Sequence, residues 1–201
     1  GLDEVLRPRL CVGRPIKGGV ETTDDPLAKF ATTSDMLSTL MMIALTAEDN
    51  WEGFAFDIHQ FHQSTDIPDD ARPIITTQPK GFEHTGPNGE PANEMFKWLN
   101  KQMQGTRTAS AMANAQLDRL LIEVGGFRRT LGDSRVFVLT HDEHGGVRLA
   151  MLSDDGLGAS EKPAGRHYTL EIVKKWYKIS HDGPWQVHRG FEARSVLNRF
   201  E

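Results

Sequence analysis

Arg148-Leu-Ala-Met-Leu-Ser-Asp-Asp-Gly-Leu-Gly-Ala-Ser160 is the stretch that most constrains the fold of this chain. An apolar run, a turn at Asp154-Asp155-Gly156 and a second run of small and apolar residues predict a strand, a tight turn and a returning strand. Two adjacent carboxylates at the tip repel each other, so they need solvent or a divalent cation. An ordinary solvated hairpin turn and a metal site both fit this pattern.

A third aspartate lies in another run with strand character, Gly53-Phe-Ala-Phe-Asp-Ile58. The aromatic and aliphatic side chains would share one face of this strand, and the small residues would share the other with Asp57. Small neighbours leave room for a ligand beside the carboxylate. On neighbouring strands, Asp57, Asp154 and Asp155 could hold two Mg²⁺ ions about 4 Å apart, the arrangement that polymerases use for displacement at phosphorus.

The composition is that of an ordinary globular protein. The 201 residues, 38% of them hydrophobic and 25% charged, are enough for one domain with a sizeable core. No apolar run approaches the roughly 20 residues needed to cross a bilayer, and no signal-peptide pattern is present. The single cysteine, Cys11, suits a reducing compartment, so we expect an intracellular protein, cytoplasmic or nuclear, that is not secreted. The net charge of −5 counts mildly against a nucleic-acid partner, although basic clusters such as Arg128-Arg129 could still contact phosphates.

Hydrophobic spacing predicts mixed secondary structure. Ser34 as an N-cap would start a helix over 35–47, with a core-facing stripe at Leu37, Leu40, Met41, Ala44 and Leu45. A second helix is expected over 108–124, stopped by Gly125-Gly126, with an apolar face at Met112, Ala115, Leu117, Leu120, Leu121 and Val124. Strands are expected at 9–12, 51–58, 136–139 and up to Asp154, a third helix around 170–177, and further strand character over 185–198. This mixture without a regular βαβ repeat predicts an α+β fold.

Several segments, taken in order, resemble the palm of copia-type (pseudovirus) LTR-retrotransposon reverse transcriptases. The matching segments span nearly the whole chain and are Arg9-Leu-Cys-Val12, Phe56-Asp-Ile58, Gln78-Pro-Lys-Gly-Phe-Glu83, Leu99-Asn-Lys-Gln-Met-Gln-Gly-Thr-Arg107, Gly126-Phe127, Arg135-Val-Phe-Val138 and Ser153-Asp-Asp155. The stretch Phe191-Glu-Ala-Arg-Ser-Val-Leu-Asn-Arg199 is similar to the "EIRILNR" stretch of a marine-protist branch of that family. The ordered set is more specific than any one motif.

This resemblance implies an RNA-directed DNA polymerase. The fold would be a polymerase right-hand palm, an antiparallel sheet packed on helices, with partial fingers and no thumb. Residues 1–201 would form a single truncated domain, with a fingers remnant and first palm helix in 1–50 and the palm in 51–201. The implied partners are an RNA/DNA primer–template, deoxynucleotides and other parts of a Gag-Pol polyprotein, with no membrane.

The resemblance also implies the site residues. Asp57, Asp154 and Asp155 would be catalytic and would bind two Mg²⁺ ions, or Mn²⁺ in their place, with help from the carbonyl of Ile58. Nucleotide binding would fall to four positions: Arg9, His62, Gly105 and Arg107. Arg9 is also consistent with a solvated surface arginine, and Gly105 with a simple turn before a helix.

Departures from the family pattern leave a second interpretation open. His62 stands where the family has an aromatic residue that selects against ribose. Gln104, Met112-Ala113 and Leu152 replace a usual Tyr, an Asn-Trp pair and an aromatic residue. A polymerase-inactive palm remnant that serves as a binding or structural module is therefore the alternative.

Two histidine pairs raise the question of a zinc site. His59 and His62 would point to opposite faces of a strand, so they would chelate together only on a helix. His141-Asp-Glu-His144 lies in an expected hairpin loop, where a solvated charged turn is the favoured interpretation.

Overall fold

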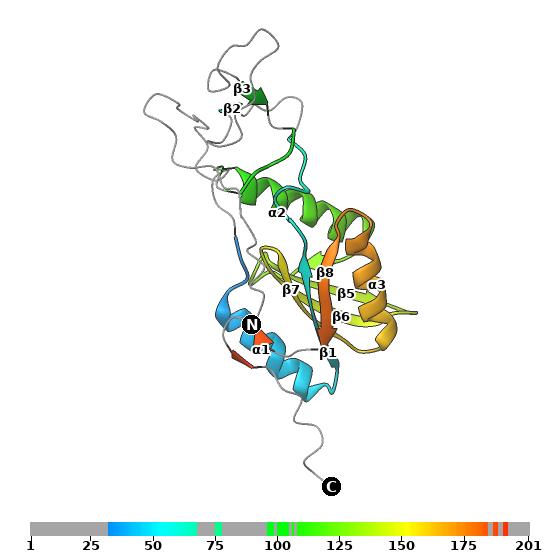
Figure 1. Cartoon of the computed structure of the whole chain (residues 1–201). Coiled ribbons are helices and arrows are strands. Elements are labelled where there is room, and N and C mark those ends of the chain that lie inside the picture. Colours follow the sequence, from blue (N-terminus) through cyan, green and yellow to red (C-terminus); the bar gives the residue numbers. More distant parts are fainter. Residues whose placement is uncertain are drawn as a thin grey trace, which may run out of the picture.

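A six-stranded antiparallel sheet forms the centre of the fold in the computed structural model, which describes residues 32–67, 75–77, 96–98, 100–104, 106, 108–184, 187–188 and 191–192. The strand order is β4-β5-β6-β7-β1-β8 (Figure 1). The strands are β1 (Glu52–Ile58), β4 (Arg128–Arg129), β5 (Val136–His141), β6 (Gly145–Leu152), β7 (Asp155–Ser160) and β8 (Ile179–Pro184). Two short ladders pair β2 (Ile75–Thr77) with β3 (Phe96–Trp98) and β9 (Val187–His188) with β10 (Phe191–Glu192).

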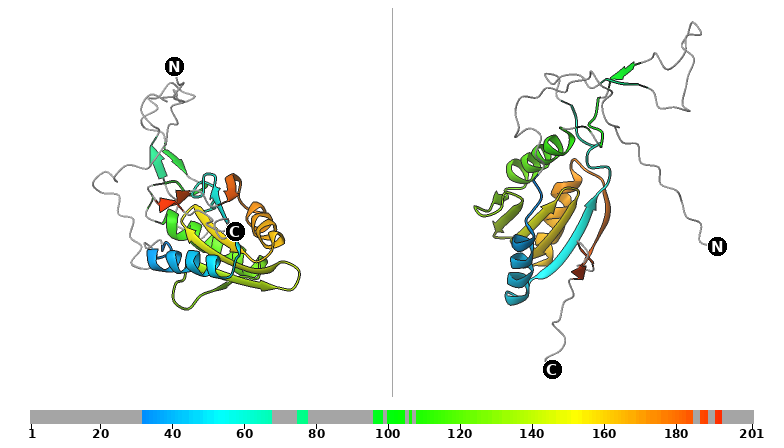
Figure 2. Two further views of the ribbon diagram at one scale, coloured as in Figure 1. Left: turned by 90° about the horizontal axis from the view of Figure 1, so that it is seen from below. Right: turned by 90° about the vertical axis from the view of Figure 1, so that its left-hand side faces the viewer.

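Helices cover both faces of the sheet, which confirms the α+β class. α2 (Ala109–Arg119) continues into one π-helical turn, η3 (Leu120–Val124), and packs with α3 (Pro163–Lys174) against one face. α1 (Met36–Glu48) lies across the opposite face (Figure 2). Arg9, Gly105, Arg107 and the strand expected at 9–12 lie outside the described residues.

The main core lies between the sheet and the α2–α3 layer. Alternation along β1 points Phe54, Phe56 and Ile58 into it, as the sequence predicts, and all three are buried. Phe54 pairs with Gly158 and Phe56 with Gly156 on β7. A Cβ atom on Gly158 would lie 2.3 Å from Cζ of Phe54, and one on Gly156 would lie 2.2 Å from Cζ of Phe56. These glycines therefore make the room that the two rings occupy.

Gly158→Ala is expected to lower the free energy of unfolding by about 2 kcal/mol, because the new methyl group overlaps the Phe54 ring in a filled core. Urea denaturation measures this change. Gly132→Ala is the matched control, since its Cβ would meet no atom within 4 Å. The variant Gly158→Ala/Phe54→Leu should recover part of the loss. Equal effects at Gly158 and Gly132 would contradict the packing described here.

The core-facing stripe expected on α1 is wrong. Leu37 is 64% exposed, Met41 57% and Leu40 47%, and Leu45 and Ala44 are exposed as well. Thr39, Met42 and Thr46 are buried instead, and the two threonine hydroxyls donate to the carbonyls of Asp35 and Met42 one turn earlier. With their hydroxyls bonded inside the helix, threonines can face an apolar layer. The apolar residues of this helix occur on several of its sides, so their spacing does not identify the buried side.

The helix boundaries differ from the expected ones in small ways. The N-cap of α1 is Asp35, whose carboxylate accepts from the Leu37 amide at 3.0 Å, whereas the expected cap, Ser34, is buried and its amide donates to Met151. In the second helix Leu117, Leu120 and Leu121 are buried as expected. Ala115 is exposed because it lies about 200° around α2 from the buried Leu117, and Val124 is exposed at the end of the π-helical turn over Leu120–Val124. The third helix starts at Pro163 and ends at Lys174, before Trp176 and Tyr177.

Candidate functional site

The register of β1 on β7 brings the first aspartate beside the second and third. Asp57 is the direct cross-strand partner of Asp155, so their side chains share one face of the sheet. The Ile58 amide donates to the Asp154 carbonyl at 2.9 Å. The three aspartates therefore lie at one end of the sheet, although about 100 residues separate Asp57 from the other two in the sequence.

The β6–β7 hairpin presents Asp154 and Asp155 on a very short turn. Leu152 and Asp155 form the last strand pair, so the loop consists of Ser153 and Asp154 alone. Ser153 has a φ of +68°, in the left-handed region that glycine prefers. A serine there stores backbone strain of order 1 kcal/mol, and such strain is common at functional sites. The expected strand–turn–strand is confirmed, with β6 ending at Leu152 rather than at Asp154.

The carboxylates differ in their surroundings. Asp57 and Asp154 are half-buried, and Asp155 is exposed. The Ser180 hydroxyl, on the neighbouring strand β8, hydrogen-bonds the Asp57 carboxylate and also lies 3.2 Å from its carbonyl oxygen. The β1–β8 pairing shifts register between Asp57 and Ile58, an irregularity that often accompanies functional sites. Ser180 thus fixes the first aspartate from the side opposite β7.

His62 lies close to this end of the sheet, in the turn that follows β1. Its Nε2 is 3.0 Å from the Ser110 hydroxyl, in the first turn of α2. The Phe61 ring packs edge-on against the imidazole with centroids 5.5 Å apart. Burial lowers the pKa of His62 from its ordinary 6.5, and the negative charge of Asp154 opposes that change. His62 and Asp154 are thus electrostatically coupled.

Asp154→Asn is expected to lower the pKa of His62 further, because it removes the charge that raises this pKa. Mg²⁺ bound at the aspartates should act in the same direction. Since the pKa of the folded state lies below that of the unfolded state, the His62 contribution to stability should fall as the pH drops below 6.5. An NMR titration of the His62 ring measures the pKa, with Asp142→Asn as a distant control. An unchanged pKa in Asp154→Asn would contradict this coupling.

The aspartates are not drawn into a tight cluster. Among the residues that the structure describes, one group of three metal-ligating side chains has all its ligand atoms within 4.8 Å of one another, and it is His141, Glu143 and His144. Asp57, Asp154 and Asp155 do not form such a group. Carboxylates repel one another unless a cation neutralises them, which favours some separation of these three side chains.

Two positioning residues were not predicted from the sequence. Ser180 belongs to β8, an edge strand whose sequence Ile179-Ser-His-Asp-Gly-Pro184 lacks the alternation that marks a strand. Ser110 lies in the first turn of the predicted helix α2, but its partner His62 is 48 residues away in the sequence. No local signal could have revealed either contact.

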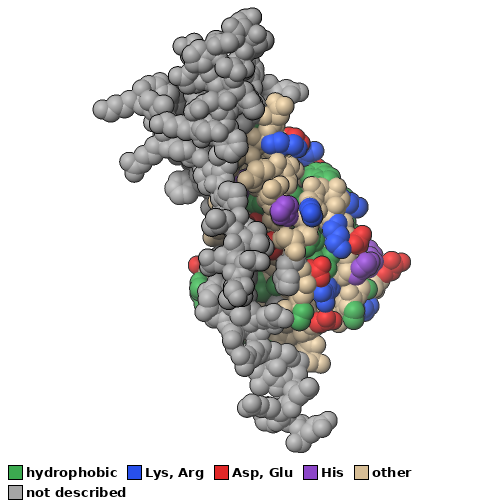
Figure 3. Space-filling view, in the orientation of Figure 1, with side chains coloured by type: hydrophobic (Ala, Val, Ile, Leu, Met, Phe, Trp, Pro, Cys, Tyr) green, Lys and Arg blue, Asp and Glu red, His purple; other side chains and the backbone are tan. Residues whose placement is uncertain are grey.

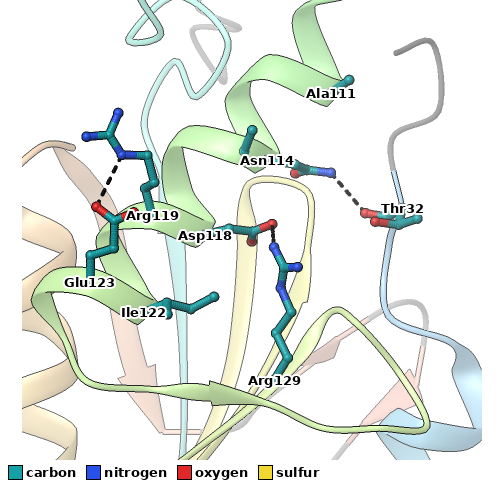
Figure 4. Close-up of a pocket in the computed structure, with 9 residues that line it drawn as sticks. Thr32, Ala111, Asn114, Asp118, Arg119, Ile122, Glu123 and Arg129 are labelled. Carbon is teal, nitrogen blue, oxygen red and sulfur yellow. Dashed lines mark hydrogen bonds and ion pairs between the residues drawn. The ribbon is translucent and has the colours of Figure 1, made fainter. Parts of the chain in front are cut away.

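Two cavities flank α2, and Asp57, Asp154 and Asp155 line neither of them. The first, of about 430 Å³, contains two ion pairs, Arg119–Glu123 and Arg129–Asp118, with N–O distances of 3.3 and 2.5 Å (Figure 4). The second, of about 640 Å³, lies between α2 and the turn after β1, beside Trp176. The four charged side chains that line the first cavity are thus paired with one another.

Comparisons with protein-family models, with curated proteins and with solved structures gave no match. None of the helices in the described part of the chain is long and apolar enough to cross a membrane. On the face drawn in Figure 3, the described basic and acidic side chains are interspersed rather than gathered into one patch.

Proposed function

We propose that this chain is the palm of a copia-type reverse transcriptase, which adds deoxynucleotides to a primer 3′-end by two-metal nucleotidyl transfer. The observation that carries this proposal is the pairing of Asp57 with Asp155 across β1 and β7. Beside this pair, the Asp154 carbonyl accepts a hydrogen bond from the Ile58 amide. The antiparallel sheet with helices on its faces supports the palm assignment. The ordered resemblance along the sequence points the same way.

The donor set suits Mg²⁺, because carboxylate and carbonyl oxygens are its preferred protein ligands. When bound, two such ions would polarise the primer 3′-hydroxyl and neutralise the pyrophosphate leaving group. Asp57 and Asp155 would hold them from adjacent strands, and Asp154 from the turn. Ser180 would keep the Asp57 carboxylate oriented, while His62, fixed by Ser110, would lie near the incoming sugar.

The test is primer extension on a primed RNA template with Mg²⁺ and deoxynucleotides. We expect template-dependent extension that releases one pyrophosphate for each nucleotide added. No extension, even with Mn²⁺ and excess protein, would overturn the polymerase proposal for this chain.

A palm remnant that binds without catalysis is the second candidate. The arrangement of the three carboxylates favours this candidate. Their oxygens do not all lie within 4.8 Å of one another, and Asp57 accepts a hydrogen bond from Ser180. Binding of primer–template that Mg²⁺ does not strengthen, together with no extension, would support this candidate over the first.

A further inference from the structure

We propose that the turn between β5 and β6 binds a divalent cation of the zinc class through His141, Glu143 and His144. Each of these side chains offers one ligand atom, and the three atoms lie within 4.8 Å of one another. Two imidazoles and one carboxylate are a ligand set found at zinc sites that keep the fourth position for water. This site is independent of the proposed polymerase activity.

The turn that carries the three ligands is short, and hydrogen bonds from the segment before α3 hold its backbone. β5 ends at His141 and β6 begins at Gly145, so the loop is Asp142–His144, and Gly145 has a φ of +74°. A three-residue hairpin loop followed by a left-handed glycine is a well-defined turn. Glu161 accepts from the Gly146 amide at 2.7 Å, and Lys162 donates to the Asp142 carbonyl at 3.3 Å. These contacts fix the backbone that presents the ligands.

Aromatic packing restricts both histidine rings. The His144 ring stacks on Tyr168 of α3 with centroids 4.3 Å apart and an interplanar angle of 20°. The His141 ring stacks on His144 at 4.4 Å. The Tyr168 hydroxyl donates to the Gly125 carbonyl at 3.3 Å, so the tyrosine that supports the stack is itself anchored. The two imidazoles are therefore held next to each other before any metal arrives, and the His144 ring is restricted by Tyr168.

Metal binding requires a small movement of the His141 ring. The Glu143 amide donates to Nδ1 of His141 at 3.2 Å, which directs the lone pair of this nitrogen toward the turn. A cation would take that lone pair in place of the amide. Because the two stacked rings have nearly parallel planes, they must also tilt until their lone pairs converge. The His144–Tyr168 stack can remain while His141 moves.

The ligand set separates this site from the aspartates. Imidazole nitrogen suits Zn²⁺ and its neighbours Co²⁺, Ni²⁺ and Cu²⁺, whereas Mg²⁺ takes oxygen ligands. Seven residue steps along β6 lie between Gly145 and Leu152, roughly 23 Å of strand. The two sites are therefore at opposite ends of the same hairpin strand, and they prefer different cations.

The experiment is a Zn²⁺ titration of the whole chain in excess Mg²⁺, which saturates all-oxygen sites. Calorimetry gives the affinity, and NMR of the imidazole nitrogens reports which rings bind. We expect the His141 and His144 rings to shift together on adding one equivalent of Zn²⁺. His141→Ala and His144→Ala should each weaken this binding by at least about 10-fold, since losing even an outer-shell partner of a metal ligand has cost that much.

His167→Ala is the matched control, because His167 is exposed on α3 and is not among the proposed ligands. It should leave the affinity unchanged. Glu143→Gln should weaken binding while the His144–Tyr168 stack persists, which distinguishes a lost ligand from a disrupted turn. The proposal is overturned if Zn²⁺ does not bind, or if it binds without shifting the His141 and His144 rings.

Discussion

Asp154→Asn/Asp155→Asn should lower Mg²⁺-dependent primer extension by about 1,000-fold or more. Asparagine keeps the size of both side chains but removes two charges from the proposed metal ligands. Losing the charge stabilisation that bound metal ions provide is worth several kcal/mol, and about 4 kcal/mol corresponds to three decades in rate. Single-turnover extension on a primed RNA template measures the change in the chemical step.

Asp142→Asn is the matched control for this double variant. Asp142 is an exposed aspartate in the other turn of β6, and it belongs to neither proposed ligand set. It should extend primers at the rate of the unmodified chain. Thermal unfolding should show that the double variant is folded, since it removes a carboxylate pair that repels. Residual extension within 10-fold of the unmodified chain would contradict the assignment of these aspartates.

Asp118→Asn is expected to lower the free energy of unfolding by about 3 kcal/mol. Asp118 on α2 pairs with Arg135, whose side chain is only 1% exposed and which directly precedes β5. Burial lowers the pKa of Arg135, while the charge of Asp118 opposes that change. Nε and Nη2 of Arg135 have no hydrogen-bond partner in the part of the chain that the structure describes. Asp118 therefore compensates this buried charge, and an amide could not do so.

Arg129→Gln is the comparison variant, because it removes only the exposed partner of Asp118 and leaves the buried partner, Arg135, in place. Arg129 also binds Asp118, but its side chain is 45% exposed, so its removal should cost less than about 1 kcal/mol. Urea denaturation of both variants gives the comparison. A loss in Asp118→Asn as small as that in Arg129→Gln would mean that the buried guanidinium is compensated in some other way.

The sheet could be predicted where alternation was strong. The pattern of Phe54, Phe56 and Ile58 marked both the buried face of β1 and the face that carries Asp57. The aspartate pair with the following glycine marked the hairpin. What no pattern could supply was the register, and a slip of one residue would have turned Asp57 away from Asp155.

The failures have specific physical causes. On α1, apolar residues occur on several sides, so the pattern did not identify the buried side. That side carries Met42 and two threonines whose hydroxyls donate to carbonyls within the helix. On β8, a polar sequence with little alternation concealed the edge strand that brings Ser180 to Asp57. The β5–β6 turn is a largely exposed hairpin turn, as predicted, although its charged sequence did not indicate that His144 stacks on Tyr168 of α3. The contacts of Ser180 with Asp57 and of His144 with Tyr168 join segments whose spacing in the sequence carries no signal.

A Mg²⁺ titration followed by NMR of the aspartate carboxyl carbons tests the central claim most directly. If Asp57, Asp154 and Asp155 form one metal site, their three signals should shift together over the same range of Mg²⁺ concentration. Asp57→Asn should weaken the response of the other two, because the ligands bind the ions jointly. Asp142 and Asp118 should not respond. Signals that stay unchanged, or that shift independently of one another, would contradict a shared two-metal site at this end of the sheet.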